Sequence, residues 1–323
     1  MKKIILVIVT TALCSIFGYF IFKQIRQLPR VAGTYISRLD KQTIFFPNNS
    51  DFSYYYLANP STTISEKRPW DNTLATYTIN EDSLNERFDY IPIKPNGVLR
   101  IITLGDSFTF GHYINTEENW TEILEDILAK NPICKQIHKI EVINLGERGF
   151  DIPYTTKKYT DIGQKYHPDF LIWLESGTGF TRYNELMRPY IEKCEIEASS
   201  VSATYTQDIT RCWVQSEKLM MQQYSEKTIR SQLSIWLDRF LSVRSNTPVI
   251  FATFHSTPDG DKNILREKQK NNAYVHFTDE ISDIYSQDGV FPDGHPNQKG
   301  HRIMADDIYR YLFKNRQSLF QCN

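Results

Sequence analysis

The sequence comprises 323 residues, of which 41% are hydrophobic, enough for one full core with chain left over for an anchor and a connecting segment. Its 37 basic residues face 38 acidic ones, and a formal net charge of −1 leaves no positive surplus to hold a phosphate backbone, so we expect no nucleic-acid partner. The sequence also lacks a glycine-rich phosphate loop, a nucleotide fingerprint and paired metal ligands, so we predict no cofactor and no metal.

An uncharged apolar run covers residues 4–22, with Lys2 and Lys3 before it and Lys23 after it. At about 1.5 Å per residue, a helix of this length crosses the hydrocarbon of a bilayer. Residues 1–23 are therefore predicted to be a transmembrane signal anchor, with a cleaved signal peptide as the alternative. The short lysine-bearing N-terminal side favours the cytoplasm, so we expect the rest of the chain to be extracytoplasmic.

Four of the five cysteines follow this run, an even number in a compartment that tolerates disulfides. Cys194 and Cys212 fall in one polar insertion and are the predicted pair. Free, partly buried thiols are the alternative.

The sequence changes character at the K-P-N-G turn that ends at Gly97. Residues 24–97 are irregular and are predicted to be a connecting and packing segment. From 98 to about 316, short apolar runs alternate with amphipathic stretches, which is typical of a parallel α/β sheet. A polar insertion interrupts this domain at about 180–215.

The apolar runs predict the strands of the sheet, and the amphipathic stretches between them predict helices packed on it. The predicted strands are 98–104, 140–145, 170–174, 248–254 and 273–277. The predicted helical or amphipathic stretches are 117–129, 153–166, 217–243 and 298–312.

A G-D-S tripeptide, Gly105 to Ser107, follows the first predicted strand directly. A serine at a strand end projects where sheet ligands gather, and its backbone N–H can point at a developing oxyanion. Gly105 allows the sharp turn, and Asp106 is expected to fix that turn through backbone hydrogen bonds. A surface turn is the alternative reading of so short a motif.

A serine nucleophile needs a histidine to take its proton and a carboxylate to orient that histidine. Asp293 and His295 lie two apart in one loop before the last helix, so we predict them to be the acid and the base. Asp288 is the alternative acid and His301 the competing base. The other histidines are not preceded by an aspartate in this way and are expected to be solvated or structural. They are His112, His138, His167, His255 and His276.

With these motifs, the chain resembles the SGNH/GDSL hydrolases over about residues 98–312. The resemblance implies a flavodoxin-like three-layer α/β/α sandwich with Ser107 as both nucleophile and oxyanion donor. It assigns Gly146, after the second strand, a second oxyanion-binding N–H. It places the triad acid and base on Asp293 and His295. In many members the acid and the base are three residues apart, and in a subset they are two residues apart, as here.

The third family block departs from its usual G-x-N-D and reads Gly177-Thr178-Gly179-Phe180. The asparagine that completes the oxyanion hole is missing, and losing such a donor costs on the order of 10² to 10³ in rate. We therefore expect either that Thr178, a backbone amide near Gly179, or Asn184 compensates, or that the enzyme is slow. The segment before the first block also resembles membrane-tethered relatives, which makes it part of the same unit.

Three functions follow from this sequence. The first is hydrolysis of acyl esters, acetyl among them, on cell-envelope glycans, lipids or smaller molecules, with Ser107, His295 and Asp293 as the triad. The second is O-acyl transfer by the same residues to a sugar hydroxyl. The third is a non-catalytic glycan-binding or assembly protein with a degenerate oxyanion hole.

Overall fold

The computed structural model describes residues 44–45, 52, 55–134, 137–176, 180, 183–199 and 205–320. Its centre is a sheet of five parallel strands in the order β6-β5-β7-β8-β9. The strands are β5 (Val98–Leu104), β6 (Lys139–Asn144), β7 (Phe170–Glu175), β8 (Val249–Phe254) and β9 (Val275–Ile281). Counted along the chain this is the order 2-1-3-4-5, the doubly wound order of flavodoxin-like folds. The predicted α/β class and central parallel sheet are confirmed.

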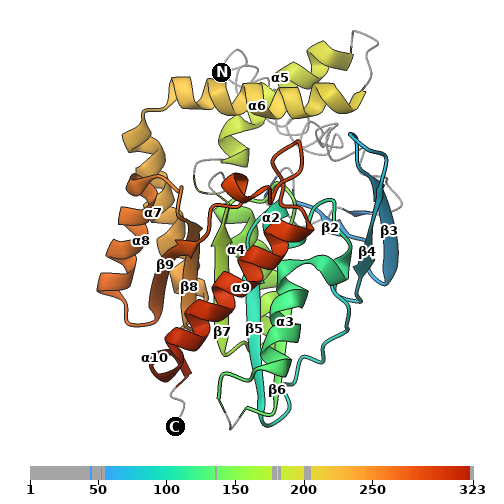
Figure 1. Cartoon of the computed structure of the whole chain (residues 1–323). Coiled ribbons are helices and arrows are strands. Elements are labelled where there is room, and N and C mark those ends of the chain that lie inside the picture. Colours follow the sequence, from blue (N-terminus) through green and yellow to red (C-terminus); the bar gives the residue numbers. More distant parts are fainter. Residues whose placement is uncertain are drawn as a thin grey trace, which may run out of the picture.

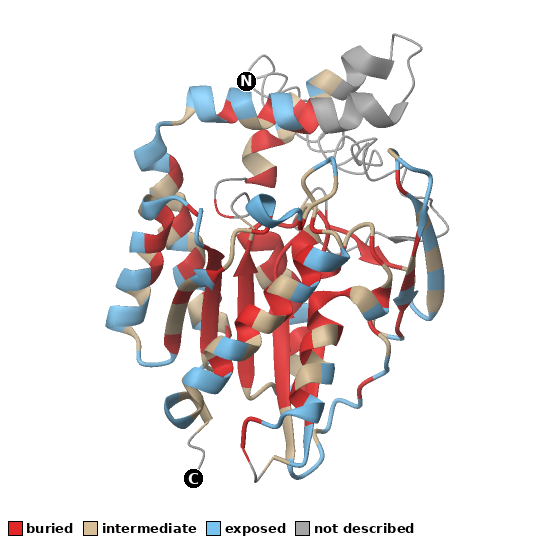
Figure 2. Cartoon of the chain, in the orientation of Figure 1, coloured by how far each residue is buried: buried red, intermediate tan, exposed pale blue. Residues whose placement is uncertain are grey.

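The sheet is buried on both faces because helices cover each of them (Figures 1 and 2). One apolar cluster joins the sheet to α3 (Trp120–Lys130) and α9 (Gln298–Lys314), which lie in front of it in Figure 1. The other joins it to α4 (Ile152–Asp161), α7 (Glu226–Val243) and α8 (Asp259–Asn271). The neighbours Ile101 and Ile102 belong to opposite clusters, as the two-residue period of a strand requires.

Three predicted helical stretches are divided in the structure. The stretch 153–166 is α4 followed by the 3₁₀ turn η3 (Gly163–Tyr166). The predicted helix 217–243 is two helices, α6 (Tyr205–Gln223) and α7, because Ser225 is extended there and its hydroxyl accepts from the Thr228 N–H at 3.2 Å. Helix 117–129 is divided in the same way by Asn119, which caps α3 after a 3₁₀ turn. Helix α8 was not predicted, since its sequence is strongly polar with few apolar positions.

The described part of the polar insertion contains α5 (Asn184–Ser199) and most of α6, which lie at the upper end of Figure 1. Cys194 of α5 and Cys212 of α6 form a disulfide with their Cα atoms 5.6 Å apart, so the predicted pair is confirmed. Both helices pack through apolar side chains onto the start of α4 and the segment near Tyr55. The insertion is thus fixed to the end of the sheet at which α2 (Ser107–Phe110) lies.

The segment predicted to connect and pack is folded wherever the structure describes it. It contains β1 (Ile44–Phe45), β2 (Leu57–Ala58) and an antiparallel hairpin, β3 (Thr62–Lys67) with β4 (Leu74–Ile79). One face of the hairpin is buried, and Tyr77 meets Phe110 of α2 edge to face at 5.1 Å. This contact brings the hairpin beside the end of β5.

The remaining short elements lie in the connections or at the end of the chain. They are the 3₁₀ turns η2 (Thr116–Glu118), η3 (Gly163–Tyr166) and η4 (Tyr285–Gln287), and α10 (Arg316–Phe320). The predicted anchor, residues 1–23, lies outside the described residues. Among the residues that are described, no helix is both long and apolar enough to cross a bilayer.

Candidate active site

Ser107 is the first residue of the short helix α2, three residues after Leu104, the last residue of β5. The Asp106 carboxylate accepts the Phe108 N–H at 3.0 Å and so caps this helix, as the sequence predicts. Gly105 has φ of +152°, and a Cβ there would lie 2.3 Å from Thr109 Oγ1 and 2.8 Å from the Leu174 carbonyl oxygen. Only glycine fits this turn, which presents the Ser107 side chain at the carboxyl end of the sheet.

His295 lies in the loop between η4 and α9, which is held by its own backbone hydrogen bonds. The Phe291 N–H donates to the His295 carbonyl at 2.7 Å, and the Gly294 N–H donates back to the Phe291 carbonyl at 2.9 Å. Gly294 has φ of +91°, a conformation that favours glycine. This tight loop returns the chain so that Asp293 and His295 face the same side.

The structure brings the three predicted triad residues together. His295 Nε2 lies 3.0 Å from Ser107 Oγ, and His295 Nδ1 lies 2.8 Å from Asp293 Oδ2. The Asp293 carboxylate also accepts the His295 backbone N–H at 3.1 Å. Partial burial would raise the pKa of Asp293, but the hydrogen bonds from His295, and the charge of that ring when it is protonated, lower this pKa below its usual value. An ionised Asp293 fixes the proton of neutral His295 on Nδ1, which leaves the Nε2 lone pair for the serine hydroxyl.

The two competing residues lie elsewhere. His301 is fully buried in α9, where its Nδ1 accepts the Trp120 N–H at 3.1 Å, and burial lowers its pKa to about 3. It therefore links α9 to the start of α3. Asp288 is in the left-handed conformation at the end of η4, and its carbonyl accepts from the Asn297 side chain at 2.9 Å.

Among the predicted oxyanion donors, the Ser107 N–H has no hydrogen-bond partner within the described chain. The Gly146 N–H, by contrast, donates to Asn144 Oδ1 at 2.8 Å, so it does not stand ready as the resemblance implied. Gly146 is required for packing instead, because a Cβ there would lie 2.4 Å from the Phe110 nitrogen. Thr178 and Gly179 lie outside the described residues.

Gly149, which the sequence reasoning did not select, is in the same loop after β6. It has φ of +71°, an added Cβ would meet nothing within 4 Å, and its N–H has no partner among the described residues. Its carbonyl accepts the Asn184 side-chain amide at 2.8 Å, so Asn184, one of the expected compensating donors, holds this loop. The sequence signal that could have identified Gly149 is its place as the second glycine of the G-E-R-G segment at residues 146–149.

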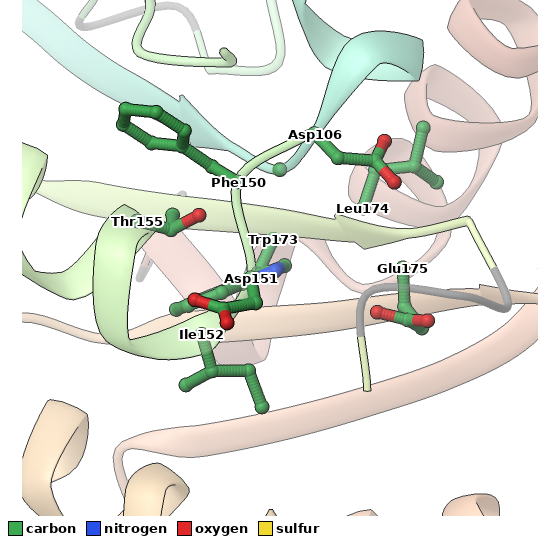
Figure 3. Close-up of a pocket in the computed structure, with 9 residues that line it drawn as sticks. Asp106, Phe150, Asp151, Ile152, Thr155, Trp173, Leu174 and Glu175 are labelled. Atoms are coloured by element: carbon green, nitrogen blue, oxygen red, sulfur yellow. The ribbon is translucent and has the colours of Figure 1, made fainter. Parts of the chain in front are cut away.

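The Gly105–Asp106 turn lines a cavity of about 10 Å³, together with residues of α4 and β7. Figure 3 shows eight labelled residues of this lining. Asp106, Asp151 and Glu175 contribute carboxylates to its lining. Its volume suits one water molecule and is far too small for a substrate. Across the described residues, no group of three or more histidine, cysteine, aspartate or glutamate side chains could hold a metal ion.

The wall beside His295 is aromatic. The Tyr113 ring lies 5.8 Å from the His295 ring, Trp70 lies 5.0 Å from Tyr113, and Phe291 lies 5.1 Å from Trp70. Arg68 fixes this group, because its guanidinium lies 4.5 Å over the Phe291 ring and its Nε donates to the Tyr113 carbonyl. The three rings are partly exposed, so they offer flat faces next to the candidate base.

No protein-family model matches the chain, and no curated protein matches it. Solved structures do match. The psychrotrophic esterase EstA from Pseudoalteromonas sp. is 15% identical, with a TM-score of 0.41 over 67% of this chain and 97% of that one. The Clostridium thermocellum family 3 carbohydrate esterase is 15% identical, with a TM-score of 0.40 over 69% of this chain and 98% of that one. A lipolytic protein of the G-D-S-L family from Veillonella parvula is 16% identical, with a TM-score of 0.37 over 66% of this chain and 97% of that one.

Of these three, the Veillonella parvula protein is described as a member of the G-D-S-L family, the family that the sequence motifs resemble. At identities of 15% to 16%, these similarities are distant.

Proposed function

We propose that the protein is a serine ester hydrolase with Ser107 as nucleophile, His295 as base and Asp293 as the acid that orients it. The observation that carries this proposal is the unbroken chain of contacts from Asp293 Oδ2 through the His295 ring to Ser107 Oγ, at 2.8 and 3.0 Å. These distances allow proton transfer without rearrangement. Ser107 in α2 and His295 in the loop before α9 are 188 residues apart in sequence.

In the first half-reaction Ser107 Oγ bonds to the acyl carbon while its proton moves to His295 Nε2. The tetrahedral intermediate then loses its alcohol, which takes the proton from Nε2, and an acyl-serine remains. Water attacks that ester in the second half-reaction and passes a proton to Nε2. The Ser107–acyl bond breaks, and Ser107 regains the proton as the carboxylic acid leaves.

The carbonyl oxygen becomes negative in both half-reactions and needs N–H donors. The unpaired N–H of Ser107 supports its assignment as the first donor. We assign the second to Gly149, whose N–H is unpaired in the described chain and whose loop is anchored by Asn184. The Gly146 N–H would first have to leave Asn144.

For the substrate we propose acyl esters, acetyl among them, of cell-envelope glycans. The partly exposed rings of Trp70, Tyr113 and Phe291 support this choice, because a sugar ring can stack its apolar face on them while its ester reaches Ser107. The proposal predicts that Trp70→Ala lowers kcat/KM for acetylated oligosaccharides, measured by released acetate. An unchanged kcat/KM would remove the aromatic wall from substrate binding.

We also propose that residues 1–23 anchor the protein to the membrane, with the catalytic domain outside the cytoplasm. The apolar run at residues 4–22 supports the anchor. The Cys194–Cys212 disulfide supports an oxidising compartment. Protease digestion of intact cells tests this orientation, since a cytoplasmic catalytic domain would remain protected.

The deciding experiment assays the full chain in detergent against p-nitrophenyl acetate, butyrate and octanoate, beside Ser107→Ala. We expect the variant to lose at least about 10³-fold in kcat. Ser242→Ala, an exposed serine of α7, is the matched control and should retain full activity. Equal rates for wild type and Ser107→Ala would favour the non-catalytic glycan-binding protein. Transfer of the acyl group to an added sugar in place of hydrolysis would identify an acyltransferase.

A further inference from the structure

A second imidazole lies against the candidate base. His112 follows α2, and its Nδ1 is 3.4 Å from His295 Nε2, with the two rings nearly perpendicular at 83°. On its other side, His112 Nε2 is 3.3 Å from Glu66 Oε1. The sequence did not pair these residues, because Glu66 is in β3 of the upstream hairpin, 46 residues away. The His112 side chain is only 11% exposed.

Glu66 has further donors at its other oxygen. Tyr77 Oη and Arg148 Nη1 each donate to Glu66 Oε2 at 2.9 Å. Burial would raise the pKa of Glu66, but His112, Arg148 and the Tyr77 hydroxyl lower it well below its usual range. Glu66 is therefore an ionised acceptor, and the His112 nitrogen that faces it must carry the proton.

This assignment decides what His112 presents to His295. Burial lowers the pKa of His112 to about 4, although the Glu66 carboxylate opposes that shift, so the ring is neutral at pH 7. With its proton on Nε2, neutral His112 has a lone pair on Nδ1. In the resting site that lone pair faces the His295 Nε2 lone pair, and no hydrogen joins the two.

Resting on the proposed function, we propose that Glu66 and His112 form a second carboxylate–imidazole pair that positions and stabilises protonated His295. When Ser107 gives its proton to His295 Nε2, a new Nε2–H group forms on His295. This group can donate a hydrogen bond to His112 Nδ1 as well as to the substrate oxygens. The hydrogen bond exists only after the proton has moved. It therefore stabilises the charged intermediate and the transition state that leads to it more than the resting enzyme.

The surroundings of His112 are consistent with this role. Its ring stacks on Tyr113 at 3.7 Å, and the Tyr113 N–H donates to the Tyr77 hydroxyl at 2.9 Å. The charged or titratable groups that face His112 are Glu66, Arg148, His295 and the stacked Tyr113 ring. Glu66 is the acceptor, while Arg148 and His295 disfavour a charge on His112. The pair is thus held by β3, β4 and the loop after β6.

Three variants and a control test the proposal. His112→Phe keeps the ring and removes the acceptor, so we expect kcat/KM for p-nitrophenyl acetate to fall about 10- to 100-fold, the range for one hydrogen bond to a charged group. The acid limb of the kcat/KM profile should move to lower pH, because protonated His295 loses its acceptor. Lys67→Gln, the exposed neighbour of Glu66 in β3, is the matched control and should match wild type.

Glu66→Gln should invert the His112 tautomer. Because Tyr77 and Arg148 both donate at the Oε2 position, the new carbonyl oxygen should occupy it and the NH₂ should face His112 Nε2. The His112 proton then moves to Nδ1 and opposes a proton on His295. We expect a loss at least as large as that of His112→Phe, and no additional loss when Glu66→Gln is combined with His112→Phe.

The tautomer is read independently of activity by ¹⁵N–¹H NMR of the histidine rings. We expect the His112 proton on Nε2 in wild type and on Nδ1 in Glu66→Gln. Any of three results would overturn the proposal. The first is a kcat/KM of His112→Phe within twofold of wild type, and the second is an acid limb that does not move. The third is a loss from Glu66→Gln that persists in the His112→Phe background. An inactive wild-type enzyme would refute the esterase function instead, and the NMR result would still decide whether the pair exists.

Discussion

Replacing Asp293 by asparagine and by alanine distinguishes two roles of this carboxylate. Asp293 Oδ1 accepts the His295 backbone N–H at 3.1 Å, and Oδ2 holds the His295 Nδ1 proton at 2.8 Å. In Asp293→Asn the carbonyl oxygen should keep the backbone bond, so the NH₂ faces Nδ1. The neutral ring must then carry its proton on Nε2, where it cannot accept the Ser107 proton. In Asp293→Ala the correct tautomer stays available, and only the orienting charge is lost.

The size of the expected loss in kcat follows from how exposed the Asp293 and His295 side chains are. Two unit charges about 4 Å apart interact by about 1 kcal/mol in water and by about 4 kcal/mol at an effective dielectric constant of about 20. The side chains of Asp293 and His295 are 30% and 24% exposed, so the interaction is partly screened. We therefore expect Asp293→Ala to lower kcat about 10²-fold, less than the about 10⁴-fold of a buried triad acid.

We expect Asp293→Asn to be slower than Asp293→Ala by a further factor of about 10, from the wrong tautomer. The assay is kcat for p-nitrophenyl acetate between pH 6 and 9, with intact folding checked by thermal unfolding. Asp288→Asn, in the same loop, is the control and should stay within about twofold, the scatter of a surface substitution. If Asp293→Asn keeps as much activity as Asp293→Ala, the tautomer reasoning is wrong. If Asp288→Asn shows the large loss, Asp288 is the orienting acid.

Three further predictions concern stability. Gly146→Ala should lower the free energy of unfolding by about 1–3 kcal/mol in urea titrations, because its Cβ would overlap the Phe110 nitrogen; an unchanged midpoint would contradict the close packing. The pKa of His301 is lowered from 6.5 to about 3, so the stability that it contributes is full above pH 6.5 and is lost as the pH falls toward 3. His301→Asn, which can still accept the Trp120 N–H, should flatten the decline of the thermal midpoint between pH 6.5 and 4, and an equally steep decline would refute this cause. Burial and the nearby Glu122 raise the pKa of Glu86, so its contribution to stability is lost as the pH rises. Glu86→Gln should therefore stabilise the protein more at pH 8 than at pH 5. The reverse order in urea titrations would contradict this prediction.

The sequence predicted the sheet and the place of the nucleophile, because both depend on neighbouring residues. Continuous apolar runs became β5, β7 and β8, since strands buried on both faces admit few polar side chains. Gly105 and the residues after it had to turn where β5 ended. The two-residue spacing of Asp293 and His295 predicted that the two side chains lie in one loop.

Only the tertiary structure decided which polar groups are partners. Gly146 had the motif position of an oxyanion donor, but its N–H is taken by Asn144, while Gly149 three residues later is open. Glu66 and His112 carry no mutual sequence signal, because a strand hairpin and a helix end meet only after the hairpin packs on Phe110. Periodicity is set by local backbone geometry and can be read along the chain. Hydrogen-bond partnership depends on distances between loops, and those are fixed only when distant segments pack together.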